Sequence, residues 1–462
     1  METECTATQV EFEGVSGRRL VAAFDGGHVS SDGGLVLLHR VDRQFGLLKR
    51  FAACFRDHRQ PELIKHPVEE LVRQRVYGIA CGYEDLVDHA SLRSDPLLAA
   101  VVGKAEPAEE PLASPSTLNR LERTLANATA KSWYRKLVYD TEAIEDFFVD
   151  AFLDAHQKAP KELVLDLDAT DDPIHGTQEG RFFHGYYGNY CYLPLYIFAG
   201  DFILSAKLRT SDIDASAGAL DGVERLVARI RARWPKVKLV LGADSGFARD
   251  ELMSWCEENG VDYVFGLARN ERLVARIAVA LEDVRRRAEG TGKSVRLFRE
   301  LRYRTLHSWS RSRRVVAKAE QLGDKSNPRF VVTSFPARLY RAQHLYEVLY
   351  CARGDMENRL KEQQLALFSD RTSAHTMRAN QLRLWFASVA YVLLKLLRHF
   401  GLKGTELERA QAGTIRTRLL KIGAVVRVSV RRVVLSLSAA SPVRELFARI
   451  AELLRANMPT PS

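Results

Sequence analysis

Acidic residues at the ends of two apolar runs are the side chains of this sequence best suited to chemistry. Asp166 and Asp168 lie in the run ELVLDLDATDD at 162–172, and Asp244 ends the run KVKLVLGAD at 236–244. Side chains alternate along a β-strand, so Asp166 and Asp168 are expected to share one face. Two like charges on one face repel unless a cation lies between them, and carboxylate oxygens suit a hard divalent ion. The pattern predicts a metal site at the ends of two strands.

A polar helical face further along the chain supplies a third acid. In YCARGDMENRLKEQQ, the offsets 0, 3, 7, 11 and 14 place five side chains on one face of an α-helix, namely Tyr350, Arg353, Glu357, Lys361 and Gln364. A surface helix with salt bridges between neighbouring turns would also explain the two basic residues. A face that serves only solubility rarely aligns a tyrosine with a basic group and an acid, so the alignment favours a functional surface.

The elements around these acids predict an α/β fold. Three strand-like runs come first and helices then alternate with strands, over 162–168, 186–198, 201–209, 219–234, 236–244, 249–259 and 261–268. That order is expected of a ribonuclease-H-like domain. A strand at 330–335 and two long helices, at about 345–368 and 377–400, would complete the domain.

With 462 residues, the chain is long enough for about two or three structural units. We expect a mostly helical N-terminal region, an α/β catalytic core interrupted by a basic β-rich insertion, and a C-terminal hairpin and helix. The segments are an N-terminal hairpin and helical DNA-binding region (1–157), the first part of the core (158–269), the insertion (270–328), the second part of the core (329–400) and the C-terminal tail (401–462). In the first segment, Ser114 or Ser116 is expected to cap a helix that is either a surface helix or a DNA-reading element.

Basic residues are concentrated in two places. The chain carries 68 Lys and Arg against 58 Asp and Glu, a net charge of +10 that is compatible with a polyanionic partner. Between 293 and 318, nine basic residues accompany one acid, and the partly alternating run 415–433 predicts a hairpin with a charged face. The first stretch is either a solvated sheet face or a surface for a polyanion such as a nucleic-acid backbone, with Arg311, Arg313 and Arg314 as the expected contacts. Trp309 would either stack on an extruded base or pack inside a sheet.

Other features favour an intracellular enzyme without a membrane partner. The six cysteines form no Cys-x-x-Cys pair, so neither a zinc site nor a disulfide framework is indicated. The polar, acidic N-terminus is unlike a signal peptide. The longest apolar run, 384–394, is shorter than the roughly 20 residues that cross a bilayer and predicts a buried helix.

Three motifs together resemble the D-D-E signature of cut-and-paste bacterial transposases of the insertion-sequence-4 superfamily. They are DAT at 168–170, ADSGF at 243–247, and the helical face at 350–364, which resembles the Tyr-Arg-Glu-Lys box. Within that superfamily the chain most resembles the insertion-sequence-1380 family. The resemblance extends from DGGHVSSDGG at 25–34 to the apolar helix beyond residue 380, and the motifs are short individually but fairly specific in this order.

The resemblance implies a DNA transposase with a ribonuclease-H-like core. Its metal ligands would be Asp168, Asp244 and Glu357, and its cofactor two Mg²⁺ ions, with Mn²⁺ able to replace them. Two ions stabilise both the attacking and the leaving oxygen of a phosphodiester. The enzyme would cleave at the terminal inverted repeats of a bacterial insertion sequence and join the 3′-hydroxyl ends to target DNA. Its partners would be double-stranded DNA and a second copy of the chain, and its location the cytoplasm, at the nucleoid.

The same resemblance implies contacts with DNA. Tyr350 and Arg353 would contact a phosphate near the scissile bond, and Lys361 would assist. The sequence departs from the box at its last position, where Gln364 replaces the expected lysine. Lys361, one turn earlier, is the expected substitute.

Two alternatives remain open from the sequence. LVLDLDAT also matches the first strand of haloacid-dehalogenase-like phosphatases, in which Asp166 would be the nucleophile. That alternative leaves the polar helical face unexplained. A catalytically inactive DNA-binding derivative is the second alternative, although all three proposed ligands are present. Asp171 and Asp172 are expected to lie in a solvated turn.

Overall fold

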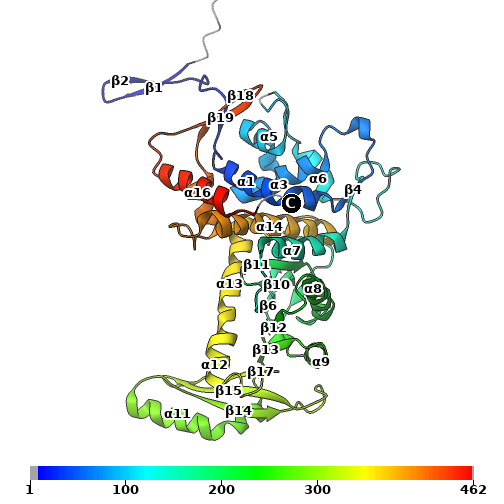
Figure 1. Cartoon of the computed structure of the whole chain (residues 1–462), viewed down its shortest axis with the longest axis vertical. Coiled ribbons are helices and arrows are strands. Elements are labelled where there is room, and N and C mark those ends of the chain that lie inside the picture. Colours follow the sequence, from blue (N-terminus) through cyan, green and yellow to red (C-terminus); the bar gives the residue numbers. More distant parts are fainter. Residues whose placement is uncertain (1–8, 108, 460–462) are drawn as a thin grey trace, which may run out of the picture. The chain divides into compact units, whose positions relative to one another are not determined.

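The computed structural model describes residues 9–107 and 109–459 and divides into two compact units (Figure 1). Unit 1 comprises Met1–Asp140 and Val389–Ser462, and unit 2 comprises Thr141–Ser388. Helix α14 (Met377–Leu397) contributes residues to both units.

Unit 1 is mainly helical and has an apolar core. Leu35, Leu38 and Val41 follow a helical spacing and are at most 1% exposed, which gives the first helix one buried face. Its helices are α1 (Leu35–Phe45), α2 (Leu47–Ala52), α3 (Val68–Cys81), α4 (His89–Leu92), α5 (Pro96–Val102), α6 (Pro115–Glu122), α15 (Ala412–Ile415) and α16 (Arg444–Asn457). Its strands are β1 (Val10–Val15), β2 (Arg18–Ala22), β3 (Val29–Ser30), β4 (Phe55–Asp57), β5 (Leu137–Tyr139), β18 (Ala424–Ser429) and β19 (Arg432–Leu437).

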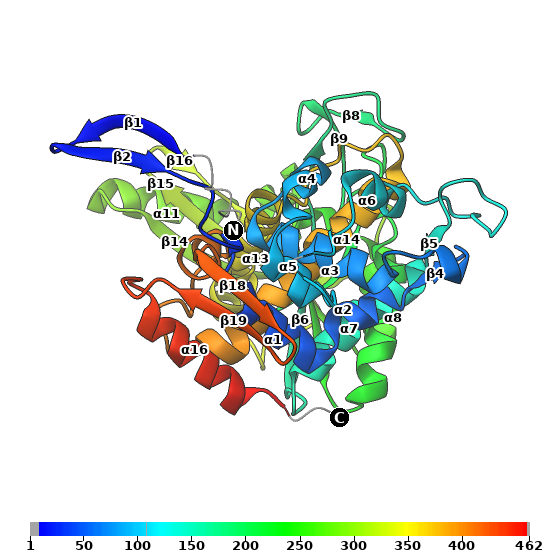
Figure 2. The same ribbon diagram turned by 90° about the horizontal axis from the view of Figure 1, so that it is seen from above.

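An N-terminal segment and a C-terminal segment of the chain pair with each other inside unit 1. Strand β3 pairs with β18, and the amides of Gly33 and Gly34 donate to the carbonyls of Ile422 and Leu420 at 2.7 and 3.1 Å. A Cβ atom on Gly34 would lie 1.9 Å from the carbonyl oxygen of Leu419, so only glycine fits there. Figure 2 shows β18 and β19, in orange, among the blue elements of the N-terminal segment. The DGGHVSSDGG run therefore has a structural role.

Unit 2 is built on a mixed sheet of nine strands. Their order is β11-β10-β6-β12-β13-β17-β15-β14, with β16 paired to β15. Strand β6 is antiparallel to β10 and parallel to β12, which is parallel to β13. The strands are β6 (Glu162–Ala169), β10 (Leu195–Ala199), β11 (Phe202–Lys207), β12 (Lys238–Ala243), β13 (Asp262–Leu267), β14 (Val295–Tyr303), β15 (Arg313–Leu322), β16 (Lys325–Ser326) and β17 (Arg329–Thr333). The predicted α/β character is confirmed.

Helices cover both faces of this sheet. Figure 1 shows α12 and α13 on one side of the strands and α8 and α9 on the other. On the α12 side, valines of four strands pack against Leu345 and Tyr346 and form an apolar core. The helices are α7 (Thr141–Ala155), α8 (Ala219–Arg233), α9 (Asp250–Glu258), α10 (Glu271–Arg276), α11 (Ala278–Thr291), α12 (Ala342–His344) and α13 (Gly354–Lys361). A small sheet of β7 (Asp172–Pro173), β8 (Phe182–His184) and β9 (Asn189–Tyr192) follows strand β6.

Two secondary-structure predictions need correction. The segment 270–328 begins with helices α10 and α11 rather than strands, and its strands then join the main sheet. In α11, Ala280 and Val284 are buried one helical turn apart, a spacing that makes a helix the better solution. The predicted hairpin at 415–433 lies instead at 424–437, because residues 412–420 are helical.

The long apolar helix is buried, as predicted. Residues Met377–Leu402 are long and apolar enough to cross a membrane by length and composition, but 83% of the most apolar window is buried inside the protein. A buried core helix of a folded protein has these properties.

Candidate active site

Strand β6 presents two aspartates beneath one arginine. Asp166 and Asp168 lie opposite Phe198 and Tyr196 of β10, two positions apart in the register, and so share a face. Asp166 is 8% exposed, and its Oδ1 atom is buried without a hydrogen-bond partner. Burial raises the pKa of Asp166, and the guanidinium of Arg353 opposes that rise.

Asp244 is placed beside Asp168 by parallel pairing. Ala243, at the end of β12, lies opposite Leu167 of β6, so the next residue of each strand reaches the same edge of the sheet. Oδ1 of Asp244 accepts a hydrogen bond from the amide of Gly246 at 2.9 Å and caps a short 3₁₀ turn. Asp168 is held in a similar way, since its Oδ1 accepts from the amide of Ala169 at 3.0 Å.

The polar helical face crosses the sheet above these acids. The helix is not a regular α-helix, because a π-helical segment (Leu345–Tyr350) and a 3₁₀ turn (Cys351–Arg353) precede α13. Irregular helical turns of this kind recur at functional sites. Nη2 of Arg353 donates to the carbonyl oxygen of Leu167 at 3.2 Å, which fixes the helix over β6.

Two strand glycines allow the helix to approach. A Cβ atom on Gly242 would lie 2.4 Å from Oδ1 of Asp166 and 3.4 Å from Cδ of Arg353. On Gly266 it would lie 2.7 Å from the hydroxyl of Tyr350. The sequence-based prediction missed both residues, although a glycine inside a strand is a known sign of close approach.

Electrostatic coupling shows which groups surround Asp168. The pKa of Asp168 is raised to about 6, mainly by burial; Arg353 opposes the rise, and the carboxylates of Asp244 and Glu357 add to it. Burial also raises the pKa of Tyr350, with Arg353 opposing and Asp244 adding to the rise. The structure therefore brings the three predicted acids, Arg353 and Tyr350 into one neighbourhood.

The donor set of this neighbourhood fits a hard divalent cation. The side chains here are carboxylates only, those of Asp168, Asp244 and Glu357. Asp244 and Glu357 raise the pKa of Asp168 because like charges repel, and a cation bound between them would offset this repulsion. Residues 9–107 and 109–459 contain no group of three or more His, Cys, Asp or Glu side chains already positioned to hold a metal ion. The acids are therefore neighbours, without forming a closed set of ligands.

The two remaining positions of the helical face differ from each other. Lys361 is exposed. Gln364 faces inward, and its Nε2 donates to Oδ1 of Asp172 at 3.0 Å and to the carbonyl of Asp171 at 3.2 Å. Asp172 is 0% exposed, so its predicted place in a solvated turn was wrong. Burial raises the pKa of Asp172 well above its usual range, and the hydrogen bond from Gln364 opposes this rise.

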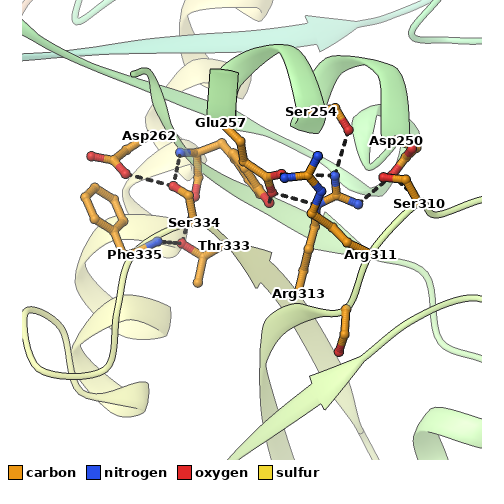
Figure 3. A network of polar contacts seen from close by, with 12 residues as sticks. Asp250, Ser254, Glu257, Asp262, Ser310, Arg311, Arg313, Thr333, Ser334 and Phe335 are labelled. Atoms are coloured by element: carbon orange, nitrogen blue, oxygen red, sulfur yellow. Dashed lines mark hydrogen bonds and ion pairs between the residues drawn. The ribbon is translucent and has the colours of Figure 1, made fainter. Parts of the chain in front are cut away.

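Two of the three arginines predicted to bind DNA are buried in ion pairs. Figure 3 shows Arg313 directed at helix α9, where it pairs with Asp250 at 2.5 Å and Glu257 at 2.7 Å. Arg314 donates to Glu300 at 2.8 Å and to the carbonyl of Phe335. The two side chains are 2% and 8% exposed, so their positions do not support contact with a DNA phosphate.

Arg311 and Trp309 have opposite environments. The side chain of Arg311 is 54% exposed and lies 3.4 Å from Glu257, so it remains accessible to an anion. Trp309 is 3% exposed and packs edge to face against Tyr303, with ring centroids 5.8 Å apart. Its position supports the packing role and not the stacking of a base.

A polar cavity of about 510 Å³ opens beside the proposed site. Its lining includes Ser245 and Tyr350 together with two basic residues, Arg269 and Arg329. Neither arginine stood out in the sequence, because each is a single basic residue at the end of a strand. A second cavity, of about 610 Å³, lies near Arg311 and Glu300.

Comparison with known proteins assigns the family. No curated protein matches the sequence. Among solved structures, one that matches is the cryo-electron microscopy structure of a piggyBac transposase synaptic complex with hairpin DNA. The two chains are 10% identical, with a TM-score of 0.42 over 93% of this chain and 82% of the other. Residues 12–459 match the family described as "Transposase DDE domain group 1". This match covers nearly the whole chain, and the protein therefore belongs to the DDE transposase family of DNA-cleaving enzymes.

Proposed function

We propose that the protein is the transposase of a bacterial insertion sequence, of the insertion-sequence-1380 family, and that Asp168, Asp244 and Glu357 form its catalytic site. The observation that carries the proposal is that Asp168 and Asp244 follow paired positions of the parallel strands β6 and β12 at one sheet edge, where Arg353 donates to the carbonyl of Leu167. Burial, with Asp244 and Glu357 adding to it, raises the pKa of Asp168 in this place. Perturbed carboxylates that gather around one arginine are typical of an active site. The family match makes the phosphatase alternative unnecessary, because it covers the chain from residue 12 to residue 459.

The core of unit 2 supports a ribonuclease-H-like fold. Its first five strands in space are β11-β10-β6-β12-β13, in which β10 is antiparallel to both β11 and β6, and β12 is parallel to both β6 and β13. Along the chain, β6, β10 and β11 come first and helices then alternate with β12 and β13, the order expected from the sequence, apart from the small sheet β7–β9 that lies between β6 and β10. On this proposal, β14 to β17 extend the core.

Each side chain has a proposed task on the DNA. Bound Mg²⁺ or Mn²⁺ would supply Lewis acidity and an activated water to the scissile phosphate. Asp168, Asp244 and Glu357 would hold the metal ions by their oxygens. Arg353, whose Nε atom has no hydrogen-bond partner, and the Tyr350 hydroxyl would orient a phosphate oxygen beside them.

The proposed reaction has two steps, and its reactants are water, the element end and the target DNA. In the first, a water oxygen bonds to phosphorus at the end of the element, the bond from phosphorus to the 3′-oxygen breaks, and a free 3′-hydroxyl remains. In the second, this 3′-hydroxyl attacks a phosphodiester of the target DNA and displaces a target 3′-oxygen. Two element ends must react together, so the proposed enzyme is a homodimer on DNA.

The test is divalent-metal-dependent cleavage of a labelled DNA end, with the Asp168→Asn, Asp244→Asn and Glu357→Gln variants. Each change keeps the side-chain size and removes the negative charge, and we expect cleavage to fall by at least about 100-fold. Asp324→Asn is the matched control, because it makes the same chemical change at an exposed turn position. Undiminished cleavage by one of the three variants would remove that residue from the site.

Asp166→Asn separates the two mechanisms. A transposase should retain measurable cleavage, since Asp166 is buried beneath the site. Loss of all turnover in this variant, together with a phosphorylated Asp166 trapped in the wild type, would establish the phosphatase mechanism instead. Intact, matching inverted repeats on both sides of the reading frame would further support transposition.

A further inference from the structure

A hairpin that follows the proposed catalytic strand carries aromatic side chains that the cleavage chemistry does not use. Strands β8 and β9 and the turn between them contain five Phe or Tyr residues among the ten positions 181–190. Four of these rings are exposed, Tyr186 by 86%, Phe183 by 58%, Tyr190 by 44% and Phe182 by 42%. Large rings are seldom grouped on a protein surface unless they bind something.

The base of this aromatic hairpin is fixed next to the proposed site. The hydroxyl of Tyr187 donates to the carbonyl oxygen of Ala169 at 3.3 Å, one residue beyond Asp168. Nδ2 of Asn189 donates to Asp171 at 3.2 Å. Burial raises the pKa of Tyr187, and the neighbouring Asp171 and Asp168 carboxylates add to the rise. The base of the hairpin is therefore held against the end of β6, one residue beyond Asp168.

The outer face of the hairpin combines rings with positive charge. Phe183 and Tyr190 are opposite each other in the register, and their ring centroids are 5.6 Å apart. The guanidinium of Arg181 lies 4.1 Å from the centroid of the Tyr190 ring. The segment 181–190 contains Arg181 and His184 and no acidic residue. Such a face suits a ligand with flat rings and a negatively charged backbone.

We propose that this aromatic hairpin stacks the unpaired bases of a DNA end next to the scissile phosphate. Arg181 supplies positive charge for the backbone, and Phe183, Tyr186 and Tyr190 supply ring faces that accept any base. The inference rests on the proposed function, since it places a single-stranded end beside Asp168. It also assigns to this hairpin the stacking that the buried Trp309 does not provide.

The test measures binding of a fluorescent 12-nucleotide oligodeoxythymidine by anisotropy, in EDTA so that no cleavage occurs. An oligonucleotide of the same length made of abasic nucleotides is the second probe. Each of the Phe183→Leu and Tyr190→Leu variants should bind the thymidine probe about tenfold more weakly, a typical loss for one stacked base. Affinity for the abasic probe should stay unchanged, because its backbone charge is the same.

Matched variants separate stacking from other causes. Tyr186→Phe keeps the ring and should bind like the wild type, whereas Tyr186→Leu should lose about tenfold. Val279→Ala changes another highly exposed apolar side chain, 86% exposed, and should have no effect. Thermal denaturation of each variant shows whether it is folded.

Several results would overturn the inference. They are unchanged affinity of the leucine variants, an equal loss for both probes, or no binding of the thymidine probe by the wild type. Dissociation of a dimer by the leucine variants, seen by sedimentation at unchanged probe affinity, would assign the rings to a protein interface. Because the assay contains no metal ion, its outcome is independent of whether the three acids catalyse cleavage.

Discussion

Replacing Asp168 by asparagine should stabilise the metal-free protein at neutral pH. In the folded protein its pKa is raised from 3.8 to about 6. The difference corresponds to a penalty of about 3 kcal/mol on the ionised carboxylate, at about 1.36 kcal/mol per pKa unit. Asparagine has nearly the same shape, and its amide oxygen can still accept the hydrogen bond from Ala169. The substitution therefore removes the penalty and leaves the local geometry in place.

The pH dependence follows from the direction of the shift. A carboxyl group whose pKa is higher in the folded state contributes stability below its unfolded pKa and loses it as the pH rises through the folded pKa. For Asp168 the window runs from about pH 4 to about pH 6. The free energy of unfolding of the Asp168→Asn variant should therefore exceed that of the wild type by less than about 1 kcal/mol near pH 4 and by about 3 kcal/mol at pH 7.5.

The assay is calorimetric unfolding in EDTA at the two pH values, with Asp324→Asn, an exposed turn position, as the control. At pH 7.5 the transition of unit 2 should rise by roughly 6 to 12 °C, the shift that about 3 kcal/mol produces in a unit of this size. Added Mg²⁺ should raise the Tm of the wild type by mass action and raise that of the variant less. Equal Tm values at pH 7.5, or the same difference at pH 4, would refute the reasoning.

Three further predictions address the support of the site. Gly242→Ala should lower the free energy of unfolding by about 1 to 3 kcal/mol through overpacking beneath the helix, measured by urea titration, with Gly413→Ala as the control because a Cβ atom there meets nothing within 4 Å. Arg313→Met should lower the free energy of unfolding by about 3 to 5 kcal/mol, because it leaves two acids without their buried partner. It should not alter the salt dependence of DNA affinity, whereas Arg311→Gln should reduce the slope of that dependence by about one. The opposite pattern would show that Arg313 contacts DNA. Tyr350→Phe should slow cleavage by about 10- to 100-fold, the value of a hydrogen bond to a charged group, without changing the Tm, and an unaltered rate would exclude a phosphate contact.

The sequence predicted the parts of the neighbourhood that local rules determine. Alternation along β6 determined that Asp166 and Asp168 share a face, and the parallel pairing of β12 with β6 places Asp244 at the same edge. The transposase prediction was confirmed by the family match. These results depend on periodicity and motif order, both of which a single sequence contains.

The failures came from partners distant in the chain. Arg313 was expected on the DNA surface, but its acidic partners lie on α9, 56 and 63 residues away. Asp172 was expected in solvent, but it meets Gln364, which is 192 residues away. A basic or acidic residue in a strand has the same local pattern whether it faces water or a buried counterpart, so composition alone could not separate the two cases.

The pairing of β3 with β18 has a consequence for biosynthesis. The hydrogen bond from Gly33 to Ile422 joins residues that are 422 − 33 = 389 positions apart. At about 5 to 20 residues per second, the ribosome needs roughly 20 to 80 seconds to make the second partner after the first. Unit 1 therefore completes its folding only when nearly the whole chain has been made, whereas unit 2 is contiguous and can fold earlier. A product that ends at residue 388 would contain all of unit 2 but only the first segment of unit 1, so premature termination would not release a complete, independent unit 1.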